Sequence, residues 1–174
     1  MSAPLSFLRR PPAPPPAGAG ATSPPALAAL PASGVAIAVA MVRPRALERL
    51  CAEAPARAAF WSATLRDPAL ADWLAPLRPT RLHVGSEFCE RLLPEPEQLE
   101  RTLAEASAAG LEVCLLTPVA SPEVLRALDA LFALLPAGAE VVVNDWGVAL
   151  RLRERHPLLQ AVAGRILCRM LKDP

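Results

Sequence analysis

The chain has 174 residues, of which 53% are hydrophobic and 20% charged, a balance that suffices for one folded domain with a substantial core. The formal net charge is +1 and only 4% of the residues are aromatic, so neither a basic nucleic-acid surface nor a base-stacking platform is indicated. The four cysteines are widely spaced and form no Cys-x-x-Cys pair. No apolar run reaches the ~18 residues of a membrane span, which predicts a soluble, cytoplasmic protein. The lack of acidic residues before Glu48 also fits a transit peptide, and this alternative stays open.

Residues 1–33 are predicted to form a disordered tail. Nine prolines lie among Ala, Gly and Ser in this stretch. Such a composition favours extended polyproline II conformations and supplies no core. A linker is the favoured interpretation, and a proline-rich ligand for another protein is the alternative.

Residues 34–174 are predicted to form an α/β domain. The β-branched, apolar run over 35–42 predicts a strand that is buried on both faces. Helical composition follows over residues 45–59, and Pro55 is expected to end or kink that helix. Asp67 before a proline is typical of a helix N-cap, which predicts a further short helix.

Repeated strand-then-helix units follow. Strands are predicted over residues 80–84, 111–117 and 140–144, and helices over 96–109, 121–135 and 146–154. The last segment is ambiguous between strand and helix, and a strand over 160–167 is favoured.

Strands that are separated by one helix each run parallel and wind into either an open sheet or a (β/α) barrel. A complete eight-stranded barrel usually needs ~250 residues, so this chain has room for about half of one. We therefore predict parallel (β/α) repeats that form a partial, half TIM-like barrel. Such a half barrel leaves an edge strand and an inner apolar face uncovered, which predicts a homo-oligomer or a heterodimer with a related protein.

Polar side chains follow the predicted strands, at the end of the sheet where parallel α/β proteins carry their sites. Glu87 follows one strand and Asp145 another, and both are candidate catalytic carboxylates for acid–base chemistry. The alternative is that each carboxylate only caps the next helix. Asn144 and Arg165 are candidate substrate-binding residues, because an arginine at this position can hold an anionic group.

Four stretches of the sequence carry a family resemblance: residues 81–91, 110–117, 141–148 and 163–167. Their order and spacing resemble the collagenase-like peptidase family, also called the U-thirty-two family. The resemblance covers roughly residues 67–174 and is strongest to the branch that assists oxygen-independent hydroxylation in ubiquinone biosynthesis. That branch has a strand followed by Gly-Glu-x-x-Cys-x-x-Arg, whereas the glutamate here lies one position later, at Glu87.

The resemblance implies a barrel-like fold of about twice this domain's length and a [4Fe–4S] cluster held by four cysteines. Cys89 matches the first of those cysteines, which makes it the candidate cofactor- and metal-binding residue. The other three belong to a segment beyond Pro174, and Cys114 and Cys168 do not match them. We therefore expect a cluster in the complete or partnered protein and none in the isolated chain. The chain is either the N-terminal part of a longer protein or a shortened relative.

Three functions remain in view. The favoured one is an accessory or catalytic component of oxygen-independent hydroxylation in ubiquinone biosynthesis, acting with an iron–sulfur partner. A peptidase is the second, although the sequence shows no Ser or Cys nucleophile beside a base and no cluster of histidine ligands. A non-catalytic interaction module is the third, so whether the protein is an enzyme stays open.

Overall fold

The computed structural model describes residues 36–168, and the predicted tail over residues 1–33 lies outside the described residues. The first half contains β1 (Ala38–Met41), α2 (Leu47–Cys51), α3 (Ala54–Leu65), α4 (Pro68–Leu74), β2 (Arg81–Gly85) and the 3₁₀ turn η2 (Glu90–Leu92). The second half contains α5 (Pro96–Ala109), β3 (Glu112–Leu116), α6 (Pro122–Leu134), β4 (Glu140–Val143), α7 (Trp146–Arg155) and β5 (Gln160–Ala163). No helix within residues 36–168 has the length and apolar character needed to cross a membrane.

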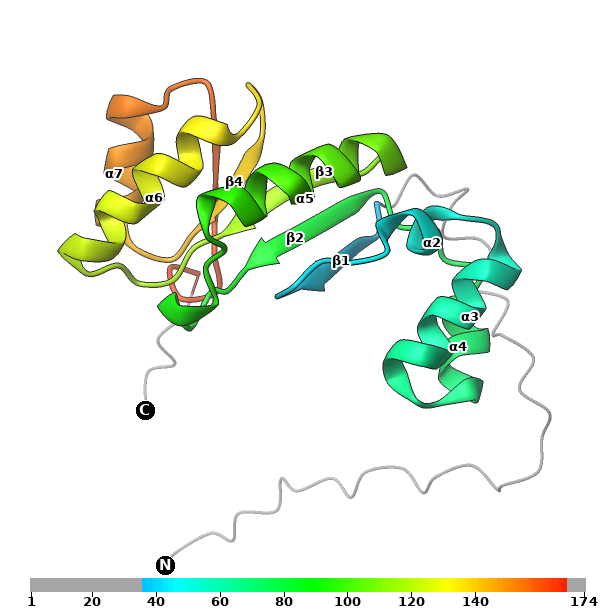
Figure 1. Cartoon of the computed structure of the whole chain (residues 1–174). Coiled ribbons are helices and arrows are strands. Elements are labelled where there is room, and N and C mark those ends of the chain that lie inside the picture. The colour runs from blue at the N-terminus through cyan, green and yellow to red at the C-terminus, as the bar shows by residue number, and fades with distance from the viewer. Residues whose placement is uncertain (1–35, 169–174) are drawn as a thin grey trace, which may run out of the picture.

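The five strands form one open parallel sheet in the order β1-β2-β3-β4-β5 (Figure 1). The prediction that the strands now labelled β2, β3 and β4 are adjacent, parallel and in that order is confirmed. The expected first and last strands are also present, as β1 and β5. The prediction that the first strand is buried on both faces was wrong, because β1 lies at the edge of the sheet and its residues are exposed or half-buried. The protein is thus an α/β protein with an open parallel sheet.

Local sequence signals explain several helix ends. The Asp67 side chain accepts a hydrogen bond from the backbone of α4, and the Ser121 side chain accepts one from the backbone of α6. Gly110 ends α5 in the left-handed conformation, at φ 72°. The interruption predicted at Pro55 is confirmed, because the helical stretch divides there into α2, which ends at Cys51, and α3, whose first turn contains Pro55. A proline is tolerated there because the first-turn N–H groups have no partner inside the helix.

The last strand is shorter than predicted, since β5 ends at Ala163 instead of continuing to residue 167. Beyond Ala163 the Ile166 N–H donates to the side-chain oxygen Oδ1 of Asn144, at 2.9 Å, rather than to a neighbouring strand. The Cys168 N–H donates to the Gly164 carbonyl, which curls the backbone into a turn. The hydrogen bond to Asn144, which directly follows β4, therefore replaces the strand pairing that would have continued β5.

One face of the sheet carries the helices. Residues paired in register share a face, which places Leu82, Val84, Leu115 and Val141 on the same side. These strand residues are buried in two clusters together with side chains of α2, α5, α6 and α7. Figure 1 shows α5, α6 and α7 in a row along this side.

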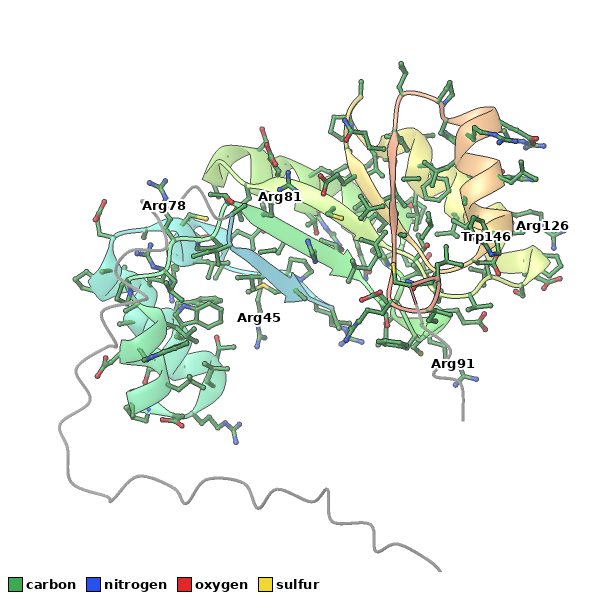
Figure 2. The ribbon with its side chains drawn as sticks, turned by 180° about the vertical axis from the view of Figure 1, so that it is seen from behind. Arg45, Arg78, Arg81, Arg91, Arg126 and Trp146 are labelled. Carbon is green, nitrogen blue, oxygen red and sulfur yellow. The ribbon has the colours of Figure 1, made fainter. Side chains whose placement is uncertain are left out.

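The opposite face lies in front of the helices in Figure 2. Its side chains include His83, Cys114, Leu116, Val142 and Val162, as the pairing register shows. Burial lowers the pKa of the His83 imidazole, so this histidine stays neutral at physiological pH.

Candidate functional site

The site lies where β2, β4 and β5 end. Gly85 is the last residue of β2 and has φ +96°, and a Cβ at this position would lie 2.6 Å from the Leu116 carbonyl oxygen. Only glycine accepts both the left-handed backbone and so close a neighbouring strand. Gly85 therefore turns the chain out of the sheet and into the loop that carries Ser86 and Glu87.

Glu87 reaches from the end of β2 to the residues that follow β5. Its Oε2 atom accepts the backbone N–H of Arg165 at 3.0 Å, and its Oε1 atom accepts Nε of the same arginine at 2.9 Å. Asn144 Nδ2 donates to Oε2 as well, at 3.2 Å. Burial alone would raise the pKa of the Glu87 carboxyl, but the hydrogen bonds from Arg165 and Asn144 outweigh it and lower that pKa. The carboxylate is therefore ionised at neutral pH, with its charge already satisfied.

Asn144 is the centre of the arrangement. It is 1% exposed, and each of its polar groups has a partner. Besides the bond to Glu87, Nδ2 donates to the Thr117 carbonyl at 2.9 Å, and Oδ1 accepts from the Ile166 backbone. The amide packs against Gly164, where a Cβ would lie 2.5 Å from both Cγ and Nδ2 of Asn144. The loops after β2, β3 and β5 are thus tied to one side chain at the end of β4.

Arg165 is held by Glu87 and covers Phe88. Its guanidinium carbon lies 4.9 Å from the centre of the Phe88 ring, a cation–π arrangement. The arginine side chain is nevertheless largely exposed, so the guanidinium remains accessible to an anionic group. Three of the predicted site residues, Glu87, Asn144 and Arg165, are therefore brought together.

Asp145 is next to Asn144 in sequence but does not take part in this network. Its Oδ1 atom accepts the backbone N–H groups of Gly147, at 2.6 Å, and Val148, at 3.2 Å. Asp145 is thus the N-cap of α7. Its position supports the capping interpretation rather than acid–base work beside Glu87.

Cys89 lies in the same loop as Glu87, at the start of η2. The Ser86 hydroxyl oxygen accepts the backbone N–H groups of Phe88 and Cys89, both at 3.2 Å, which fixes the turn. The thiol is half-buried beside a shallow pocket of about 290 Å³. Loops after β2, β3 and β5 supply the walls of this pocket: Glu87, Phe88, Cys89, Glu90, Arg91, Pro118, Val119 and Ile166.

A larger cavity, of about 720 Å³, lies at the other end of the sheet, around the beginnings of β3, β4 and β5. Arg81 pairs there with Glu112, at 3.1 Å, and with Glu140, at 2.6 Å. Figure 2 shows Arg81 at the start of β2 and Arg91 beyond its end. Because parallel α/β proteins work at the carboxyl ends of their strands, we place the candidate site at Glu87 and Cys89 and assign a structural role to the Arg81 ion pairs.

A complete iron–sulfur cluster does not fit the donors around Cys89. Such a cluster normally takes four protein thiolates. Within residues 36–168 no group of three or more His, Cys, Asp or Glu side chains is arranged to hold a metal ion. Cys114 is buried in β3, and burial raises its thiol pKa to about 11, which disfavours the thiolate form that binds metal. Cys89 can therefore contribute a ligand only alongside thiolates that lie elsewhere.

Sequence reasoning missed Thr117, Gly164 and Phe88. Thr117 contributes its backbone carbonyl, which leaves no signal in the sequence. Gly164 directly precedes Arg165, and a glycine there could have indicated close packing against another side chain. Phe88 lies between the candidate residues Glu87 and Cys89. Its exposed ring contacts Arg165, which belongs to a loop far away in the sequence, so no sequence signal indicates this contact.

Comparison of the chain with protein-family models, with curated proteins and with solved structures finds no match in any of the three.

Proposed function

We propose that this protein is a component of oxygen-independent hydroxylation in ubiquinone biosynthesis that acts with an iron–sulfur partner related to it. The position of Cys89 carries the proposal. The residue that the resemblance matches to a cluster ligand lies at the carboxyl end of β2, on the wall of a pocket. A thiol in this place is reachable from outside the sheet. Such access is necessary if Cys89 is to bind a cluster whose other thiolate ligands come from elsewhere.

We further propose that the sheet is half of a (β/α) barrel. The strand order never reverses, and right-handed crossovers then place successive helices on one side of the sheet. The bond from the Arg165 backbone to Glu87 adds support, because β2 and β5 are three strand positions apart. In a flat sheet that separation is roughly 14 Å, at about 4.8 Å per strand. The loops thus converge over the strand ends, as they do at the mouth of a barrel.

In this proposal Arg165 binds an anionic group of the substrate at the strand ends. The role of Glu87 is to position Arg165, because three hydrogen bonds already occupy its carboxylate. Asn144 fixes both residues. A bound [4Fe–4S] cluster would supply electron-transfer chemistry, and this chain would contribute Cys89 to its ligands.

The ubiquinone content of cells tests the proposal. Deletion of the gene from its host should lower ubiquinone in cultures grown without oxygen and leave it unchanged in aerated cultures. Wild-type protein and Cys168→Ser should restore the anaerobic level, whereas Cys89→Ser should not. Cys168 is the matched control because it is an exposed cysteine in another loop. An unchanged anaerobic level after deletion, or full rescue by Cys89→Ser, would contradict the proposal.

A non-catalytic interaction module is the second candidate. The saturated Glu87 carboxylate and the capping role of Asp145 favour it, because neither predicted catalytic group is free to exchange a proton with a substrate. A module of this kind would bind its partner equally well with Arg165→Ala, while anaerobic ubiquinone would stay normal. Peptidase activity has less support, since no hydrogen bond within residues 36–168 joins a serine or cysteine side chain to a histidine.

A further inference from the structure

The outer side of α7 carries a second row of side chains in addition to the one that enters the core. Val148 and Leu152 are buried against the sheet. Trp146, Ala149, Leu150 and Arg153 follow the spacing i, i+3, i+4, i+7 and therefore share another side of the helix. Trp146 is 77% exposed and Leu150 is 46% exposed. An apolar row of this kind is typical of a helix surface that contacts a second helix.

The position of α7 explains why this row is uncovered. Helix α5 contacts α6, and α6 contacts α7 on one side. α7 ends the row of helices in Figure 1, so within residues 36–168 no helix lies against its other side. The neighbouring β5 is likewise an edge strand, and all four of its residues are exposed.

A groove of about 460 Å³ runs between α7 and β5. The residues that line it are Trp146, Ala149, Leu150, Leu152, Arg153, Pro157, Leu159 and Ala161. All but one of them are apolar, and Arg153 is the only charged residue among them. A large aromatic side chain next to aliphatic ones is typical of the centre of a protein interface.

The charges on α7 point to the kind of partner. Arg151 and Arg155 both pair with Asp129 on the α6 side of the helix. Arg153 lies on the groove side, and no carboxylate within residues 36–168 pairs with it. The groove thus offers an apolar surface with one positive charge and no negative charge.

We propose that this groove binds an amphipathic helix of a partner protein, with apolar side chains against Trp146 and Leu150 and an acidic side chain near Arg153. A second copy of this chain fits less well. A two-fold interface uses the same surface of both copies, and the residues that line this groove include no carboxylate to pair with the Arg153 of a second copy. This binding role concerns another surface than the chemistry proposed for Cys89, so the two stand or fall separately.

The test uses the full chain and two stapled helical peptides of about 16 residues. Both peptides carry leucines at i, i+3, i+4 and i+7, and they differ only in one residue beside that row, which is Glu in one peptide and Lys in the other. Fluorescence anisotropy of the labelled peptides measures affinity. We expect the wild type to bind the Glu peptide about three- to fivefold more tightly, which corresponds to one favourable ion pair at an exposed position.

Substitutions in the groove should change this binding in defined ways. Leu150→Glu should lower the affinity for the Glu peptide at least about tenfold. Arg153→Glu should reverse the preference, so that the Lys peptide binds more tightly than the Glu peptide. The matched controls are Leu70→Glu on α4 and Arg101→Glu on α5, both at exposed positions, and each should leave the affinity within about twofold. The reversal also controls for folding, because a misfolded variant would bind neither peptide, whereas a folded variant should bind the Lys peptide more tightly than the Glu peptide.

Four results would overturn the proposal. One is that the wild type binds neither peptide, and another is that Arg153→Glu causes no reversal. A third is a wild-type dimer in light scattering that Leu150→Glu makes monomeric, which would assign the groove to a second copy. The fourth is a gain in peptide affinity on Leu171→Glu, which would assign the groove to the chain's own last residues.

Discussion

Replacing Asn144 by alanine should destabilise the protein strongly, although no apolar side chain is lost. The substitution leaves the Thr117 carbonyl and the Ile166 N–H without their partners, and both belong to buried or half-buried residues. Each buried polar group left unpaired costs roughly 1–3 kcal/mol, so we expect a loss of about 3 kcal/mol in the free energy of unfolding. For a urea slope of about 1.5 kcal/mol/M this lowers the unfolding midpoint by about 2 M.

Urea denaturation followed by circular dichroism measures the change. Gln98→Ala is the matched control, because it removes an amide whose hydrogen bond at the start of α5 is exposed, and it should cost under about 1 kcal/mol. A loss of less than 1 kcal/mol for Asn144→Ala would show that the amide does not hold the loops together.

A double-mutant cycle with Gly164 sharpens the test. Gly164→Ala should cost about 2 kcal/mol by itself, because the new methyl group overlaps the Asn144 amide. In the Asn144→Ala background that overlap is absent, so the same substitution should cost under about 0.5 kcal/mol. Simple additivity of the two costs would refute the packing argument.

Three further predictions concern single side chains. The pKa of Glu87 is lower in the folded state than in the unfolded state, so the carboxylate's contribution to stability is complete above the unfolded pKa and is lost as the pH falls through the folded pKa. The difference in unfolding free energy between wild type and Glu87→Gln, measured in urea, should therefore shrink between pH 7 and pH 3.5. A constant difference would count against the bonds to Arg165. Asp145→Ala should cost about 1 kcal/mol through loss of the α7 cap, with Asp145→Asn close to wild type in thermal unfolding, whereas equal losses would argue for a role of the charge. With a thiol pKa of about 11, Cys114 should react with iodoacetamide at pH 8 much more slowly than Cys168, as mass spectrometry can show, and equal labelling of the folded protein would refute its burial.

Local chemistry made the secondary structure readable from the sequence. The caps at Asp67 and Ser121 and the stop at Gly110 act within one helical turn, so their effect is independent of the rest of the fold. The parallel order of β2, β3 and β4 followed from the alternation of strands and helices. The break between α2 and α3 was equally readable, because a proline disfavours helical geometry in the residue before it and is accepted in the first turn of a new helix.

The sequence by itself determined which loops face the carboxyl end of the sheet, and hence that Glu87, Asn144 and Arg165 are near that end. Only the tertiary structure decided which of them meet. Glu87 and Arg165 are 78 positions apart, and their bond depends on how far the loops after β2 and β5 lean across the strand ends. Asp145 is adjacent to Asn144 in sequence yet turns to the helix N-terminus, because neighbouring side chains at a strand end point in opposite directions. Residue type and spacing do not encode such directions, since they are set by strand register and by packing as close as that of Gly164 against Asn144.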